Sequence, residues 1–312
     1  MIFLTQIRDP AGNTVTLNYD NQIRLTSITD ASGRSTTFNY ALTGNPLLVT
    51  AINDPFGRTA QLTYDSNNRL LQIKDVLGLT SQFAYDSSGL VNALTTPYGM
   101  TTFTYGDDGN TRFLTATDPL GNTERLEYKQ NVSSVPFLDP SNTVPQGIQN
   151  PFNEFLDGRN TFYWDKHAYA VAAGDYTKAR IRHWTHVATN NNVTSDTIES
   201  IKYPLENRIW MNYAGQEGNF LGTAVAGTFD QPTKVGRVLD DGTTQLTQLT
   251  YNALGHVTDS IDPVGRETQF VHADNQIDLI QINQRTSPTA LSTIAHFTYT
   301  HLRHLLSNNC RN

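Results

Sequence analysis

The sequence predicts an all-β fold of tandem β-hairpins that form a curled, spiral or barrel-like antiparallel sheet. One observation behind this prediction is a turn that recurs every 21 to 24 residues, and another is the alternation of apolar and polar residues after each turn. A third is a composition rich in polar residues together with Thr, Tyr and Phe, which is typical of a sheet with much wetted surface. A period in this range indicates repeat architecture rather than an ordinary compact core.

The recurring turn has the pattern Asp-Pro-x-Gly, as at residues 54–57, 118–121 and 262–265. Pro presets φ at the second position, Asp can bond the turn backbone, and Gly suits the exit from the turn. Residues 96–99 keep the Pro but replace the Asp with Thr. We expect a structural role for these turn glycines: Gly12, Gly33, Gly57, Gly78, Gly99, Gly121 and Gly265.

The residues after each turn predict a strand with one apolar face. Residues two apart share a face, so a large apolar residue such as Leu17 or Phe38 and then a Tyr recur at the same height in neighbouring strands. A return strand follows each Tyr-Asp or Tyr-Asn turn and carries an apolar residue, such as Ile52 or Ile73, two places before the next turn. We expect these tyrosines to brace the sheet through cross-strand aromatic contacts: Tyr19, Tyr40, Tyr64, Tyr85, Tyr105 and Tyr128.

Six such hairpins give about twelve strands, which at about 4.8 Å per strand make a sheet roughly 60 Å wide. Open sheets of that width usually curl, split or close. The sequence therefore predicts a wall with an inside.

The repeated phrase resembles the RHS or YD repeat, and "YDSNNRLLQIKDVLGLTSQFAYD" carries the resemblance most fully. Repeats are expected over residues 1–130 and 231–299, with a degenerate tail at 300–312. Residues 131–230 lack the phrase and resemble a mostly β insert of bacterial RHS shells, in which 131–153 reads as loop and 178–189 as strand.

The resemblance implies a strip of hairpins wound into a hollow shell, which in bacterial toxin systems encloses a C-terminal toxin. It implies a non-enzymatic structural protein without catalytic residues or cofactor. Its partner would be a C-terminal toxin or effector polypeptide, or further shell repeats. Two alternatives stay open: a secreted or cell-surface module that binds glycans through exposed Tyr rows, and an enzyme with a site in the 131–230 insert.

Charge and hydropathy narrow the classes of partner. The net charge of −7 and the absence of a basic run argue against a nucleic-acid partner. The sequence contains no apolar stretch long enough for a transmembrane helix.

Its first residues do not form a signal peptide, so we expect cytoplasmic synthesis, with export or surface display as part of a larger RHS protein. Residue 1 enters the phrase midway, which predicts that the chain is a piece of a longer gene product.

Candidate metal and modification sites are weak. We expect His183 and His186 to be two wet sheet histidines rather than zinc ligands, and His301, His304 and Cys310 form only a loose cluster in the tail. The acidic stretches at 107–110 and 240–242 read as hairpin turns rather than calcium loops. Asn131 and Asn192 fit the glycan acceptor pattern, which matters only in a eukaryotic secretory host.

Overall fold

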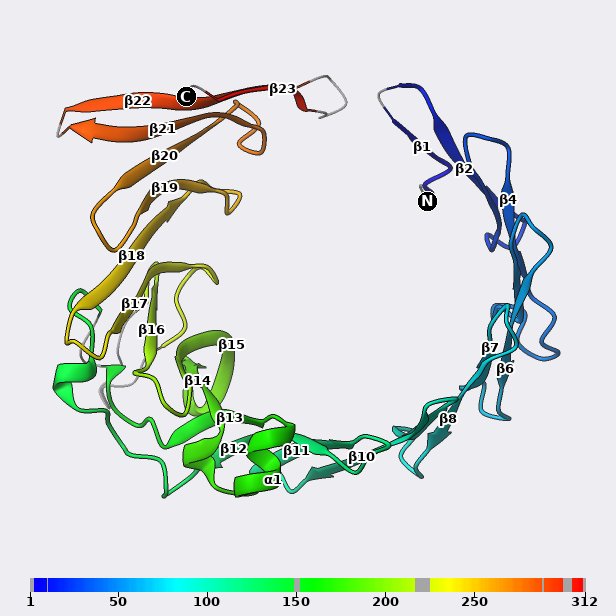
Figure 1. The fold of residues 1–312 in the computed structure, drawn as a ribbon, viewed down its shortest axis with the longest axis horizontal. Coiled ribbons are helices and arrows are strands. Elements are labelled where there is room, and N and C mark those ends of the chain that lie inside the picture. Colours follow the sequence, from blue (N-terminus) through cyan, green and yellow to red (C-terminus); the bar gives the residue numbers. More distant parts are fainter. Residues whose placement is uncertain are drawn as a thin grey trace. The chain divides into compact units, whose positions relative to one another are not determined.

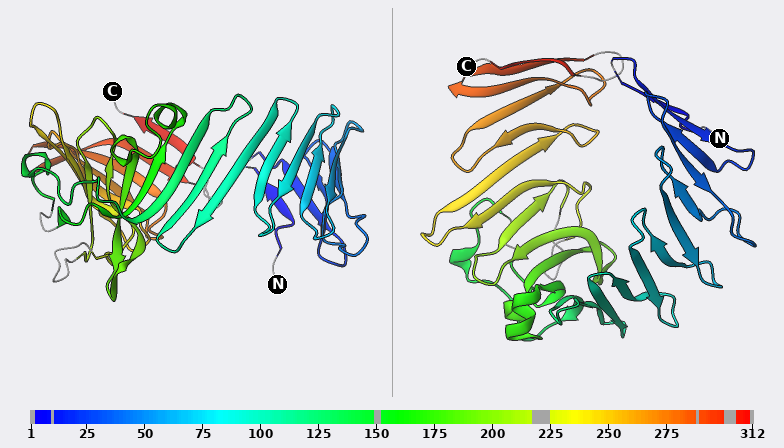
Figure 2. Two further views of the ribbon diagram at one scale, coloured as in Figure 1. Left: turned by 90° about the horizontal axis from the view of Figure 1, so that it is seen from below. Right: turned by 45° about the vertical axis from the view of Figure 1, so that its right-hand side comes forward.

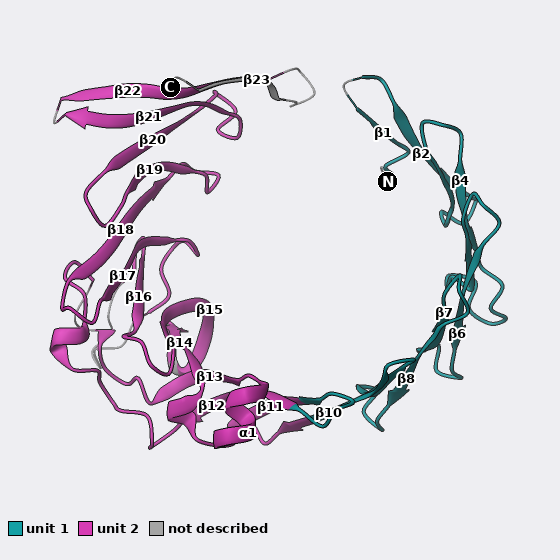
Figure 3. Cartoon of the chain, viewed as in Figure 1, with its two compact units in different colours: residues 1–104, 116–122 teal, residues 105–115, 123–312 magenta. Residues whose placement is uncertain are grey.

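The computed structural model describes residues 3–9, 11–148, 152–216, 225–287, 289–299 and 305–310. The chain divides into two compact units (Figure 3). Unit 1 comprises residues 1–104 and 116–122, and unit 2 comprises residues 105–115 and 123–312.

Unit 1 is an antiparallel sheet in which each strand pairs with the next along the chain (Figure 1). Its strands are β1 (Gln6–Arg8), β2 (Thr14–Tyr19), β3 (Leu25–Thr29), β4 (Ser35–Asn39), β5 (Ala51–Asn53), β6 (Thr59–Tyr64), β7 (Leu70–Lys74), β8 (Thr80–Tyr85), β9 (Val91–Thr96) and the first part of β10 (Gly99–Asp107). The predicted all-β fold of tandem hairpins in a curled antiparallel sheet is confirmed.

The strand register of unit 1 follows from the alternation in the sequence. Leu62 of β6 lies opposite Ile73 of β7, and Phe83 of β8 lies opposite Leu94 of β9. Facing residues in an antiparallel pair share one side of the sheet. The apolar residues of the outgoing and return strands therefore meet on one face.

A β-bulge recurs where the outgoing strand reaches its Tyr. Thr63 faces Gln72 but Tyr64 faces Leu70, so Leu71 is an extra residue in the return strand. Corresponding register shifts occur at Tyr19 and Tyr85. A bulge bends its strand and increases the local right-handed twist, so its repetition in the hairpins contributes to the curl of the sheet. The alternation pattern alone did not predict this feature.

Unit 2 continues with antiparallel neighbours from β12 onward. Its strands include β12 (Thr123–Asn131), β13 (Gly158–Trp164), β14 (Arg180–Val187), β15 (Asn190–Lys202), β16 (Ile209–Tyr213), β17 (Pro232–Val238), β18 (Thr244–Tyr251), β19 (Val257–Ile261), β20 (Glu267–His272), β21 (Leu279–Ser287), β22 (Ala290–Tyr299) and β23 (Leu305–Cys310). β11 (Thr111–Thr117) has its first five residues in this unit. The strand predicted within 178–189 is β14.

One helix, α1 (Lys166–Ala172), interrupts the insert. The sequence analysis did not predict it. Asp165 caps its first turn by accepting a hydrogen bond from the backbone N–H of Ala168 at 2.8 Å. The Ala-rich stretch that follows favours helix locally, although the surrounding pattern is one of strands.

The two units differ in how deeply their residues are buried. Among the described residues of unit 1, none is buried, so its sheet is a single layer. Unit 2 has a core because residues 132–148 and 152–156 pack on β13, β14 and β16. Val132 and Val135 contact Phe162, Trp164 and Ile181, while Ile148 and Leu156 contact Trp210.

Candidate functional site

The predicted turn glycines all have positive φ, the region in which an L side chain is disfavoured. At Gly57 (φ 78°) the backbone N–H donates to the carbonyl of Asp54 at 3.2 Å. One carboxylate oxygen of Asp54 accepts from the N–H groups of Phe56 and Arg58, both at 2.9 Å. The Gly99 turn differs, because Thr96 pairs directly with Gly99 and leaves a two-residue loop.

The Tyr-Asp turns at the other end of the hairpins use the same geometry. Asp65 accepts from the N–H groups of Asn67 and Arg69, both at 2.9 Å, and Asn68 has the positive φ of 62°. An Asp at the first position and a left-handed residue at the fourth therefore build both kinds of turn. This equivalence is not evident from the sequence pattern, in which the two turns differ at their other positions.

Four of the predicted tyrosines bind the strand that precedes their own. Their hydroxyls donate to a backbone carbonyl at, or shortly before, the start of that strand: Tyr19 to Leu4 at 3.0 Å, Tyr40 to Leu25 at 2.8 Å, Tyr64 to Val49 at 2.7 Å and Tyr85 to Leu70 at 2.7 Å. Tyr128 donates instead to the side-chain oxygen of Gln130, and Tyr105 is 39% exposed. Hydroxyl-to-carbonyl bonds link the first four to the preceding strand or the residues just before it, and the Tyr19 ring also lies 5.7 Å from the ring of Phe3.

An arginine that the sequence analysis left without a role connects successive hairpins. Arg69 donates from Nε to Asp65 at 2.8 Å, and its guanidinium lies 4.4 Å from the ring centroid of Tyr85 in the next hairpin. Arg24 makes the equivalent pair of contacts with Asp20 and Tyr40. The repeated phrase Tyr-Asp-x-x-x-Arg is the signal that identifies this link.

The main surface of unit 1 is an apolar ladder on one face of the sheet. Cross-strand pairs and residues two apart, with Thr36, Ala60 and Ser81 as intermediate links, place its members on one face: Ile7, Val15, Leu17, Ile28, Phe38, Ile52, Leu62, Ile73, Phe83 and Leu94. Every member keeps part of its surface exposed, because no described residue of unit 1 forms a second layer. Among the described residues of unit 1, the ladder is therefore only partly shielded from water.

His183 and His186 correct a prediction. They are 0% and 1% exposed, so they are buried rather than wet. His183 lies beneath the segment before β13, while the backbone of His186 pairs with residues 225–226, with Ala226 donating to its carbonyl at 2.9 Å. Asn160 donates its amide to the carbonyl of Leu156 at 2.8 Å and accepts a hydrogen bond from Nδ1 of His183 at 3.0 Å.

The histidine belongs to a buried polar cluster. Nε2 of His183 lies 3.3 Å from a carboxylate oxygen of Glu199, which is 1% exposed. Burial lowers the pKa of His183, and the Glu199 carboxylate opposes this effect. Arg208 donates to Asp139 at 2.8 Å and ties the covering segment to the sheet. Because these groups are closed to solvent, the cluster stabilises packing rather than presenting a site to a substrate.

The remaining predictions concern metal ligands, acidic turns and membrane spans. Among the described residues, no three His, Cys, Asp or Glu side chains are grouped as metal ligands. The loose tail cluster of His301, His304 and Cys310 lies outside the described residues and side chains. Residues 107–110 and 240–242 form hairpin turns, as predicted. No helix in the described part of the chain is long and apolar enough to cross a membrane.

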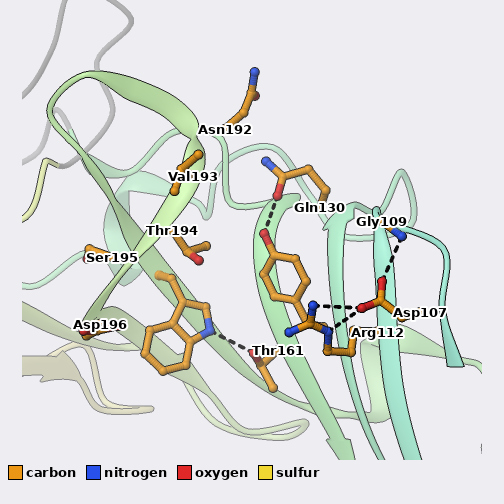
Figure 4. Close-up of a pocket in the computed structure, with 12 residues that line it drawn as sticks. Asp107, Gly109, Arg112, Gln130, Thr161, Asn192, Val193, Thr194, Ser195 and Asp196 are labelled. Carbon is orange, nitrogen blue, oxygen red and sulfur yellow. Dashed lines mark hydrogen bonds and ion pairs between the residues drawn. The ribbon is translucent and has the colours of Figure 1, made fainter. Parts of the chain in front are cut away.

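A pocket of about 480 Å³ lies in unit 2 between the ends of β10–β12 and the β14–β15 hairpin (Figure 4). Tyr128 and Trp184 line it, with Asp196 from β15 and an ion pair of Arg112 and Asp107 at 2.8 Å. The indole N–H of Trp184 donates to Thr161 at 2.8 Å. Of the tyrosines predicted to brace the sheet, Tyr128 lines this pocket.

Comparison with known proteins identifies the repeats. The family described as RHS Repeat matches residues 3–35, 24–59 and 64–101. The matched part of the chain, which lies within unit 1, consists of RHS repeats. No curated protein shows significant sequence similarity to the chain.

Two solved structures share the fold of this chain. A TcdB2-TccC3 structure without its hypervariable C-terminal region aligns at a TM-score of 0.52 and 12% identity, covering 96% of this chain. A TcdB2-TccC3-Cdc42 structure aligns at 0.53 and 12% identity, covering 97%. The chain spans 15% and 16% of the lengths of those two chains.

Proposed function

We propose that this chain is a non-enzymatic section of an RHS shell wall that encloses a toxin or other effector polypeptide. The observation that carries the proposal is the apolar ladder of unit 1, which no described residue of that unit covers. The RHS repeats and the fold shared with the TcdB2-TccC3 structures support a structural shell role. In this proposal the wall leaves the cell as part of a larger RHS protein.

The residues of the repeat have separate roles that fit such a wall. Its Asp residues cap turns, its Tyr hydroxyls bind neighbouring strands, and its apolar residues line one face. An unfolded polypeptide offers apolar side chains that gain about 25 cal/mol for each Å² removed from water against that face. We therefore assign the holding of the cargo to the ladder, and the strength of the wall to the turns and tyrosines.

A protease-protection experiment tests the proposal. The full chain is fused to an unstructured reporter polypeptide, and the half-life of the reporter is measured with a broad-specificity protease. We expect protection that falls when Leu62 and Phe83 are both changed to Asn. Thr63→Asn is the matched control, because Thr63 lies on the opposite face of the same strand. A reporter that is cleaved equally fast with and without the wall would exclude encapsulation by this section.

A glycan-binding module is the second candidate, and the 480 Å³ pocket is the observation that favours it. Aromatic rings beside polar side chains suit a sugar ring, and the pocket lies within the usual range of ligand sites. Binding on a glycan array that Trp184→Ala abolishes would support this candidate. The absence of any bound glycan would remove it.

A further inference from the structure

The turns on one side of the unit 1 sheet carry large apolar residues at their tips. Phe56, Leu77, Tyr98 and Leu120 are 66%, 80%, 85% and 87% exposed. We call these four residues the apolar rim. They occupy the turns β5–β6, β7–β8, β9–β10 and β11–β12, which a meander of hairpins places on the same side of the sheet (Figure 2).

The turns on the other side provide an internal comparison. At the third position of the Asp turn, where the N–H donates to the Asp carboxylate, the rim has Phe56, Leu77 and Leu120. The equivalent position on the other side is polar in the turns β2–β3, β6–β7 and β8–β9, with Gln22, Asn67 and Ser88. The longer β4–β5 loop is the exception, with Leu47 67% exposed at this position.

Because the backbone geometry of the two sets of turns is the same, it does not require apolar tips on one side. The apolar character is therefore a property of the surface. The rim begins at Phe56, because the preceding turn on the same side, β3–β4, has the polar residue Ser32 at the equivalent position.

Two turns of the rim are in contact, and the turn that precedes the rim also touches its first residue. Pro119 packs so closely on Gly99 that a Cβ at Gly99 would lie 2.5 Å from the Cβ of Pro119. The guanidinium of Arg34 lies 5.6 Å from the ring centroid of Phe56. Val76 and Met100, at 41% and 52% exposed, add apolar area beside the tips.

We propose that the apolar rim binds a second copy of this chain. The four tips and their apolar neighbours expose on the order of 500 Å², a large patch for a monomer. Two copies joined rim to rim would bury on the order of 1,000 Å², which is the lower limit of a specific interface. Since both rims repeat once per hairpin, the tips of one copy fit between the tips of the other in a two-fold arrangement. This contact is separate from the apolar ladder and from the proposed function.

Sedimentation velocity on the full chain tests whether the apolar rim forms a dimer. The chain is measured over about a hundredfold range of concentration. We expect a shift from the 34.7 kDa monomer to a dimer of twice that mass. The double variant Leu77→Ser/Leu120→Ser should weaken the dimer at least about tenfold. Both side chains are so exposed that the fold should persist, which circular dichroism checks.

Leu205→Ser is the matched control, because Leu205 is 93% exposed in a turn of unit 2 and is not one of the rim residues. It should dimerise like the unchanged chain. A monomer at every concentration would overturn the proposal, and so would equal dimerisation of the rim and control variants. A monomer whose co-sedimentation with phosphatidylcholine vesicles requires Leu77 and Leu120 would assign the rim to lipid instead and overturn it too.

Discussion

Replacing Tyr64 with Phe isolates the hydrogen bond that joins its strand to the preceding one. The Tyr64 hydroxyl donates to the carbonyl of Val49 at 2.7 Å, and Phe keeps the ring while removing this donor. Burial raises the pKa of Tyr64, so the hydroxyl remains a donor throughout the neutral range. A net intramolecular hydrogen bond contributes about 0.5–1.5 kcal/mol. We expect a loss of about 1 kcal/mol in the free energy of unfolding.

The same substitution at Tyr85 removes an equivalent bond of 2.7 Å to Leu70, and its ring still stacks on Arg69. Urea unfolding followed by far-UV circular dichroism measures both changes. With a urea slope of about 2 kcal/mol/M, each single variant should shift the midpoint by roughly 0.5 M. The double variant should lose about 2 kcal/mol apart from coupling through Leu70, which pairs with Tyr64 and accepts the Tyr85 bond.

Tyr98→Phe is the control, because Tyr98 is 85% exposed at a turn tip. Its midpoint should stay within the scatter of surface substitutions, about 0.5 kcal/mol. Equal shifts for Tyr64→Phe and Tyr98→Phe would refute the assignment of a bracing role to the hydroxyl bonds.

Four further substitutions test the turns and the insert, each by urea unfolding. Ile23→Asn should stabilise the chain by about 0.5–1 kcal/mol, since Ile23 has φ 66° where the β6–β7 turn has Asn68 at φ 62°; no gain would remove the claim of strain. Gly57→Val should cost about 1–2 kcal/mol from backbone strain alone, because no atom lies within 4 Å of its Cβ position, and an unchanged midpoint would contradict the turn assignment. Arg208→Met should cost about 3–5 kcal/mol by leaving Asp139 buried without its partner, whereas a cost below 1 kcal/mol would show that the pair is dispensable. The lowered pKa of His183 means that the unfolded chain gains a proton near pH 6.5 that the folded chain does not bind. Stability should therefore fall as pH decreases below about 6.5, less steeply in His183→Gln; identical pH profiles would argue against this titration.

The repeat sheet could be predicted from sequence because its determinants are local. The alternation that places Leu62 and Phe83 on one face depends only on the two-residue period of a strand. The turn at Asp54 likewise carries its geometry within five residues. Even the hydroxyl bonds repeat at a fixed separation of 15 residues, although a strand pattern does not indicate their carbonyl partners.

The insert could not be predicted in the same way because its contacts join distant parts of the chain. Arg208 meets Asp139 across 69 residues, and His183 meets Asn160 across 23. Neither pairing has a periodic signal, so the two buried histidines looked like ordinary exposed strand residues. The bulge at Leu71 also escaped prediction, because an extra residue in a return strand changes the register without changing the apolar pattern.

Site-specific photo-cross-linking tests the central claim, that the ladder face holds a polypeptide. A photoreactive phenylalanine analogue replaces Phe83 on the ladder or Ala84 on the opposite face of the same strand, in the chain fused to the unstructured reporter. We predict that mass spectrometry finds reporter peptides cross-linked at position 83 and not at position 84. Equal cross-linking at the two positions, or none at position 83, would contradict the claim.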